Sequence, residues 1–219
     1  MKTIRVFFEK RDRAKYISHL DLTRCVTRAF ARAELPAWFT EGFNPHLYLT
    51  FALPLPLGVE GARESFDFRL AEEDFPLERV GERLYAALPA DLRVVGCNQA
   101  VMKPETITWA DYEIKIFDPV GADALAGDWD KFMARPSILA EKKTKHKTRE
   151  IDLKPLLTEL SRSGQGDCLT LGLRLPAGAA LNLNPALPLS AFWEDRGGEA
   201  DYIRVLRAAI LTKELQPFI

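Results

Sequence analysis

Two hydrophobic periodicities alternate along this chain, and their order restricts its fold more than any other feature of the sequence. Ile4, Val6 and Phe8 recur at every second residue, which is the period of a strand with one buried face. From Leu22 onward the apolar residues recur with helical spacing, so residues 21–35 predict an amphipathic helix. This change of period recurs along the chain and predicts an α+β fold.

The remaining segments of the first half extend the pattern to the order βαββαβ. Residues 47–53 predict a strand, and residues 65–70 predict another because apolar and polar side chains alternate there. Pro76 opens a second helix, and residues 93–96 form a short strand. The first half therefore predicts one βαββαβ unit.

The second half repeats this order more loosely, with one additional short helix. The expected elements are a strand at 112–116, a helix at 125–133, an extended segment from Ile138, a short helix at 153–160, a strand at 169–175, a helix opened by Pro185 and capped by Asn184, and a strand at 202–210. We therefore predict two tandem ferredoxin-like (βαββαβ) units, at residues 1–101 and 110–219.

The composition and the cysteine count reduce the number of protein classes to which the chain can belong. The 219 residues are 47% hydrophobic, which is enough for a packed core. The longest apolar run falls short of the ~18 residues of a membrane span, so we expect a cytoplasmic protein without membrane contact. Cys25, Cys97 and Cys168 are too dispersed for a disulfide set or a metal site, or for an iron–sulfur cluster built from this chain alone. We expect no cofactor and no metal.

The predicted helix at 21–35 carries a row of arginines. Arg24, Arg28 and Arg32 follow one another at four-residue intervals, opposite the apolar face. Like charges at this spacing cost a few tenths of a kcal/mol each, so helix propensity does not explain them, whereas a polyanionic partner does. The alternative is an ordinary solvated face whose arginines pair with carboxylates from elsewhere in the chain.

A second basic segment lies at residues 142–149, in a chain whose net charge is only −1. If it is extended, Lys143 lies on the same side as Arg149, and Lys142 on the other side. The segment either contacts nucleic-acid phosphates or protects a strand edge from pairing with other sheets. Its candidate phosphate-binding residues are Lys142, Lys143, Lys145, Lys147 and Arg149.

Two segments of the first unit combine polar functional groups with aromatic side chains. The candidate pocket residues are Tyr16, Ser18, His19, Asp21, Phe43, Asn44 and His46. Ser18 and Asp21 have the spacing of a helix capping box. His19 or His46 could move a proton in RNA cleavage, but we favour capping or hydrogen-bonded roles, and nothing in the sequence requires the two rings to meet.

The aromatic residues near the second of these segments also have two interpretations. Phe43 or Tyr48 could stack on a base, although we expect both in the core. The sequence has no Walker loop, no dinucleotide-binding fingerprint after a strand, no HExxH and no G-x-S-x-G elbow. The chain therefore does not present the signature of an autonomous enzyme.

Several segments together resemble the radical-SAM-linked family of bacterial domains of unknown function. They are residues 16–22 (YISHLDL), 28–36 (RAFARAELP), 41–46 (EGFNPH), 51–58 (FALPLPLG), 142–145 (KKTK), 149–155 (REIDLKP) and 182–185 (NLNP). The resemblance implies a domain fused to, or encoded beside, a radical SAM protein, in a neighbourhood related to RNA or ribosomes. One departure is Leu47 and Tyr48, where the family has a proline and a basic residue.

These observations predict a non-catalytic accessory protein that binds a structured RNA, such as tRNA or rRNA, and presents it to a separate radical SAM enzyme. Two alternatives stay open. One is a metal-independent RNA endonuclease that uses His19 or His46. The other is a module that binds only the protein partner.

Overall fold

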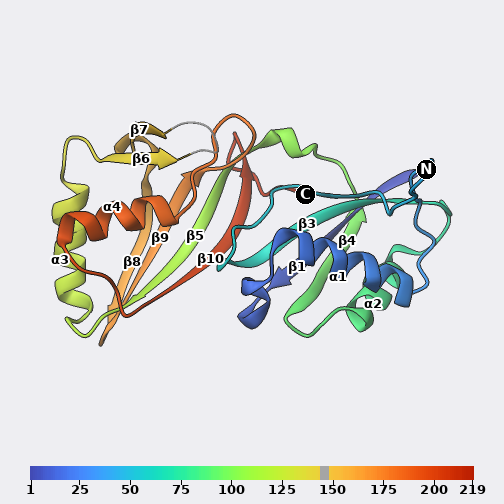
Figure 1. The fold of residues 1–219 in the computed structure, drawn as a ribbon, viewed down its shortest axis with the longest axis horizontal. Helices are drawn as coiled ribbons and strands as arrows, with labels where there is room; N and C mark the ends of the chain where they lie inside the picture. The colour runs from blue at the N-terminus through green and yellow to red at the C-terminus, as the bar shows by residue number, and fades with distance from the viewer. Residues whose placement is uncertain (144–147) are drawn as a thin grey trace. The chain divides into compact units, whose positions relative to one another are not determined.

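The chain folds into two compact units, each an α+β arrangement of helices on an antiparallel sheet (Figure 1). The computed structural model describes residues 1–143 and 148–219, with Lys143 by its backbone alone. Unit 1 comprises Met1–Ile107 and Gln216–Ile219, and unit 2 comprises Thr108–Leu215.

Unit 1 has the element order predicted for the first half of the chain. Its elements are β1 (Lys2–Lys10), the 3-10 turn η1 (Asp12–Tyr16), α1 (His19–Arg32), β2 (Leu49–Phe51), β3 (Glu60–Leu70), α2 (Leu77–Ala87), β4 (Leu92–Gln99) and η2 (Pro104–Thr106). The strands lie in the order β4-β1-β3-β2, and each neighbouring pair is antiparallel. The expected strand at 47–53 shortens to three residues.

The core of unit 1 lies between its sheet and its two helices. Ile4, Val6 and Phe8 of β1 are at most 2% exposed, as the alternation predicts. The helix residues that pack on them are Leu22, Val26, Ala29 and Phe30 of α1 with Val80 and Leu84 of α2. Both helices therefore cover one face of the sheet and leave their outer sides to solvent (Figure 1).

A buried ion pair lies on the other face of this sheet. Arg5 is fully buried and donates from Nε and Nη2 to the two carboxylate oxygens of Asp67, both at 2.7 Å. Its remaining amino group donates to the carbonyl of Ile219 at 2.8 Å, and the ring of Phe218 covers the guanidinium at 4.1 Å. The C-terminal residues thus complete unit 1.

Unit 2 adds a separate two-stranded ladder to a similar set of elements. Its elements are β5 (Ile107–Phe117), α3 (Ala122–Met133), β6 (Leu139–Lys143), β7 (Thr148–Asp152), η3 (Lys154–Leu156), β8 (Thr158–Gln165), β9 (Cys168–Pro176), α4 (Ala186–Arg196) and β10 (Tyr202–Thr212). The sheet order is β10-β5-β9-β8, while β6 and β7 pair with each other. Trp129 and Phe132 of α3 pack on Phe192 of α4 in its core.

Two local predictions in unit 2 are wrong. The short helix expected at 153–160 is instead the turn η3 followed by strand β8, which pairs antiparallel with β9. The last helix begins one residue later than predicted, with Pro185 as its N-cap. Asn184 still satisfies an N–H of the first turn, because its Oδ1 accepts from Ala186 N at 3.0 Å.

The described helices are all too short or too polar to cross a membrane.

Candidate nucleic-acid interface on the first helix

Ser18 caps the start of α1, but the Asp21 carboxylate accepts from the hydroxyl of Ser18 rather than from its backbone N–H, as the predicted capping box would require. Ser18 Oγ accepts a hydrogen bond from Asp21 N at 3.1 Å and donates to Asp21 Oδ2 at 2.7 Å. The pKa of the Asp21 carboxyl lies below its ordinary value, mainly because Ser18 donates this bond and to a lesser extent because Arg24 is near. The carboxylate is therefore ionised and also complements the helix dipole.

We expect Ser18→Ala to raise the pKa of Asp21 toward its ordinary value and to lower the free energy of unfolding by about 1 kcal/mol, through loss of the cap. The low pKa of Asp21 favours folding above the ordinary carboxyl pKa, and this contribution disappears as the pH falls through the folded value. NMR titration of the carboxyl carbon measures the shift. Thr23→Ala is the matched control, because the Thr23 hydroxyl donates to the carbonyl of His19 and not to Asp21. An equal pKa shift in this variant would contradict the role of Ser18.

The segment that leads into α1 is held by buried charged groups. Lys15 Nζ lies 3.8 Å from Glu60 Oε1, and the same carboxylate oxygen accepts from Asp12 N at 3.2 Å. Lys10 Nζ donates to the carbonyl of Ile17 at 3.2 Å. Tyr16 itself is 63% exposed, with Lys15 Nζ 5.1 Å from the centre of its ring. Tyr16 is thus presented to solvent from a fixed turn, directly before the helix.

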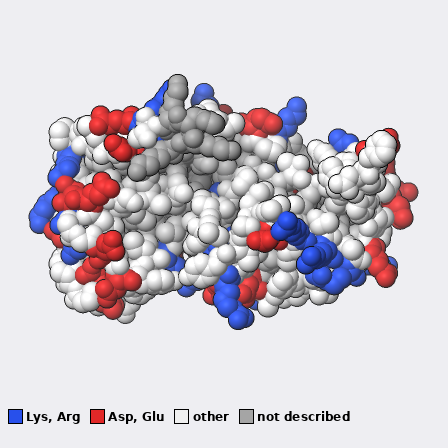
Figure 2. All heavy atoms as spheres, in the orientation of Figure 1, with Lys and Arg blue, Asp and Glu red and all other residues white. Residues whose placement is uncertain are grey.

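The arginines predicted on α1 do lie on its exposed side. Figure 2 shows Lys and Arg side chains gathered over the helices of unit 1. Arg24 Nη1 lies 3.3 Å from Asp21 Oδ1 in an exposed pair, whereas Arg28 is exposed and forms no ion pair with the described residues. Asp21 is the one described carboxylate within ion-pair distance of the three arginines. Their positive charge is therefore largely uncompensated by direct pairing.

Arg32 has an additional structural role that the sequence did not indicate. Its Nη2 donates to the carbonyl of Ala87, the last residue of α2, at 2.7 Å. Arg83 of α2 in turn donates to the carbonyls of Ala33 and Glu34 at the end of α1, at 3.3 and 3.1 Å. Each helix thus supplies an arginine that satisfies terminal carbonyls of the other. Arg83 is the residue of this face that sequence reasoning missed.

The two histidines lie in different surroundings. The ring of His19 meets the edge of the Phe51 ring at 4.9 Å between centroids. His46 Nδ1 lies 2.9 Å from Thr40 Oγ1 and 3.2 Å from the carbonyl of Asn44. The contacts of the two rings have no residue in common, so the structure does not assemble them into an acid–base pair.

The aromatic residues of the 43–48 segment differ from each other. Phe43 is fully exposed, so the expectation that it lies in the core is wrong. Tyr48 is half-buried, with the guanidinium of Arg69 over its ring at 4.4 Å and the ring of Trp38 at 5.9 Å. Phe43 is thus a free aromatic face, whereas Tyr48 already has a cation and a second ring against it.

The described part of the basic segment lies in two antiparallel strands, β6 and β7, and not in the single extended segment expected from Ile138 onward. Lys142 of β6 pairs directly with Arg149 of β7 in the antiparallel ladder, so these two residues share one face. The expectation that Lys142 and Arg149 lie on opposite sides is therefore wrong. Lys142 Nζ donates to the carbonyl of Asn182 at 2.7 Å, and Arg149 is exposed. Lys145 and Lys147, and the side chain of Lys143, lie outside the described residues.

The cysteines and acidic groups of the described residues form no cluster that suits a metal ion. Burial raises the pKa of Cys25, although Arg32 and Arg28 act in the opposite direction. Within residues 1–143 and 148–219, no three His, Cys, Asp or Glu side chains gather as metal ligands would. The arrangement that stands out in unit 1 is therefore the arginine face of α1.

A comparison with known protein families decides what the chain is related to. Residues 3–185 match the family described as "Uncharacterized protein conserved in bacteria (DUF2344)". The chain belongs to this family. The match to DUF2344 covers unit 1 through β4 and continues to the start of α4 in unit 2, so it includes both basic segments. No curated protein matches the chain.

Proposed function

We propose that this DUF2344 protein binds a structured RNA through the outer side of α1, as an accessory protein without catalytic activity of its own. The proposal rests on how few described carboxylates form ion pairs with the arginines of α1. Arg24 and Arg28 present exposed guanidinium groups, and in the part of the chain that the structure describes the exposed Asp21 is the one carboxylate paired with either of them. Guanidinium groups bind phosphates bidentately, and each phosphate that they neutralise adds salt-dependent affinity.

Two exposed aromatic side chains of unit 1 support RNA as the polyanion. Tyr16 precedes the helix and Phe43 is fully exposed in the same unit, so two aromatic faces are open to solvent. Unstacked bases of RNA loops bind such faces, whereas duplex DNA does not present its bases in this way. In unit 2, considered by itself, Arg149 of the β6-β7 ladder is exposed and offers a further phosphate contact.

We also propose that both units have the ferredoxin-like arrangement. In unit 1 the element order βαββαβ and the strand order β4-β1-β3-β2 support it. In unit 2 the same relation holds for β5, β8, β9 and β10, with the β6-β7 ladder inserted after α3. This arrangement leaves the outer sides of the helices available to a ligand.

The proposed setting is beside a separate radical SAM enzyme, to which the protein would present its RNA. The resemblance described above supports this setting, as do three dispersed cysteines, which suit a chain that leaves cluster chemistry to its partner. Co-purification of the two proteins, dependent on RNA and abolished by nuclease treatment, is the expected result. Complete absence of association would remove the partner from the proposal.

The double variant Arg24→Gln/Arg28→Gln tests RNA binding. Arg32 is kept, because it also caps α2. With a fluorescent tRNA as probe, we expect the dissociation constant to rise about tenfold and the slope of log K against log salt to fall by about one unit per arginine. Fluorescence anisotropy between low and physiological salt measures both quantities.

The matched control is Arg63→Gln. Arg63 lies over the ring of Phe7, on the sheet face away from the helices, so the variant removes one charge from a different surface. Equal weakening by Arg63→Gln, or unchanged binding by the double variant, would refute the α1 interface.

The endonuclease alternative predicts cleavage of the probe that His19→Ala or His46→Ala abolishes, whereas we expect intact RNA with the unmodified protein.

A further inference from the structure

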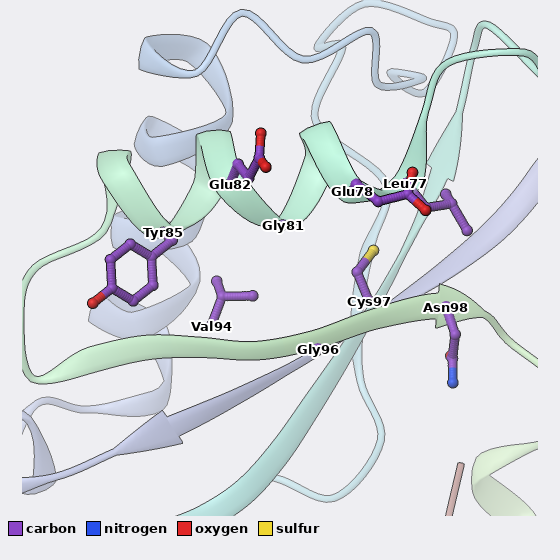
Figure 3. Close-up of a pocket in the computed structure, with 9 residues that line it drawn as sticks. All are labelled: Leu77, Glu78, Gly81, Glu82, Tyr85, Val94, Gly96, Cys97 and Asn98. Carbon is purple, nitrogen blue, oxygen red and sulfur yellow. The ribbon is translucent and has the colours of Figure 1, made fainter.

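A groove of about 570 Å³ runs between α2 and β4 in unit 1 (Figure 3). Leu77, Gly81 and Tyr85 line it from the helix, and Val94, Gly96 and Cys97 line it from the strand. In Figure 3 the side chains of Val94 and Cys97 point from the strand toward the helix, while Asn98 extends away from it. The groove is therefore mainly apolar, and none of its lining residues belongs to the arginine face of α1.

Gly81 keeps this groove open. A glycine in the interior of a helix costs about 1 kcal/mol relative to alanine. The backbone of Gly81 does not require glycine, since its φ is not positive, and a Cβ atom there would lie 3.9 Å from the Cβ of Cys97, at ordinary contact distance. Neither conformation nor crowding therefore explains Gly81. What the glycine provides is space above β4.

The strand beside the groove has an unpaired edge. β4 is the terminal strand in the order β4-β1-β3-β2, so β1 pairs with one of its edges and the described part of unit 1 supplies no strand for the other. Such an edge presents N–H and C=O groups that an added strand can satisfy. A groove between an edge strand and a helix suits an extended peptide, which pairs along the strand and places alternate side chains under the helix.

The rim of the groove is acidic. Glu78 and Glu82 of α2 lie four residues apart, are exposed, and form no ion pair with any residue of the described ranges. Like charges at this spacing repel each other on an isolated helix. The thiol of Cys97 is neutral, since burial, with a smaller effect of Glu78, raises its pKa to about 12. A lysine or arginine of a ligand would relieve the repulsion between the two glutamates, whereas a phosphate would increase it.

We propose that the groove between α2 and β4 binds an extended segment of a partner protein, which pairs with β4, places apolar side chains at alternate positions under α2 and directs a lysine or arginine to Glu78 and Glu82. The segment adds a strand to the sheet of unit 1. Main-chain pairing supplies affinity, and the groove and the two glutamates supply specificity. The proposal is independent of RNA binding by α1, because it uses none of the same residues.

The probe is a synthetic peptide of eight residues, the length of β4, in which valine and one lysine occupy alternate positions separated by threonine. We expect it to shift the backbone amide signals of β4 and α2 in NMR spectra of the full chain. Replacement of its lysine by glutamate should weaken binding about tenfold, because an attraction becomes a repulsion. Glu78→Gln/Glu82→Gln in the protein should remove most of this difference between the two peptides.

Gly81→Phe is the decisive variant, since it fills the groove and leaves every charge in place. We expect Gly81→Phe to abolish peptide binding while tRNA binding is retained. If phenylalanine prevents folding, Gly81→Ala is the milder variant, and we expect it to weaken peptide binding. The proposal is overturned if neither peptide shifts the β4 amides, if the glutamate peptide binds as well as the lysine peptide, or if binding survives Gly81→Phe. Dimerisation of the peptide-free chain through β4 would assign the edge to a second copy instead.

Discussion

Asp67→Asn is expected to lower the free energy of unfolding by about 3–5 kcal/mol, because it leaves a buried cation without its counterion. The guanidinium of Arg5 is fully buried, and the Asp67 side chain that receives its two 2.7 Å hydrogen bonds is 11% exposed. Arginine does not lose its proton in proteins, so the charge cannot be avoided by neutralisation. Asparagine keeps the shape of the site but removes the negative charge.

Urea unfolding measures the loss, and hydrogen exchange assigns it to unit 1. The matched control is Asp111→Asn in unit 2, where Arg174 makes the same two-pronged contact at 2.7 and 2.8 Å but both side chains are 19% exposed. Water can solvate the remaining cation there, so we expect a clearly smaller loss. Equal losses in the two variants would contradict the role of burial.

Local signals in the sequence predicted those parts of the fold that depend on neighbouring residues. The apolar face of α1 and its N-cap at Ser18 are properties of residues three or four positions apart, and both are confirmed. The alternation of Ile4, Val6 and Phe8 likewise predicted the buried face of β1. The same alternation predicts that Arg5 is exposed to solvent. In the structure the other face of β1 is also covered, by residues more than two hundred positions later in the chain, which the alternation cannot indicate.

The error at residues 153–160 has a specific cause. Leu153, Leu157 and Leu160 have helical spacing, but Pro155 sits in a 3-10 turn and β8 begins at Thr158. Pairing with the regular strand β9 outweighs this weak helical pattern, since strand formation depends on a partner distant in sequence. Leu160 is accordingly 44% exposed.

The candidate site shows the same division between local and long-range information. Helical spacing correctly predicted that Arg24, Arg28 and Arg32 share the exposed side of α1. It could not predict that Arg32 caps α2, because that contact depends on how two helices pack. The groove of α2 and β4 was also missed, although a glycine in the middle of an amphipathic helix, at position 81, is a signal that could have indicated it.

Trp129→Ala should lower the free energy of unfolding by about 3–5 kcal/mol through loss of the largest fully buried side chain among the described residues. Trp129 is fully buried, and its ring packs against Phe132 at 5.4 Å and Phe192 at 5.2 Å between centroids. These contacts join α3 to α4. No neighbouring side chain can fill the resulting cavity without leaving its own packing position, so the unit relaxes only partly.

Trp129→Phe separates packing from hydrogen bonding in the same site. The indole Nε1 donates to Glu159 Oε2 at 2.9 Å, and Arg162 donates to both oxygens of that carboxylate at 2.8 and 2.9 Å. Because Arg162 keeps Glu159 satisfied, phenylalanine should cost much less than alanine. The hydrogen bonds to Glu159, that from Arg162 above all, hold its pKa below the ordinary value, and Trp129→Phe should raise that pKa slightly. Urea unfolding measures the stability and NMR titration measures the pKa. Equal destabilisation by phenylalanine and alanine would show that the hydrogen bond to Glu159 of β8, and not the packing of the ring against α4, accounts for the stability that Trp129 provides.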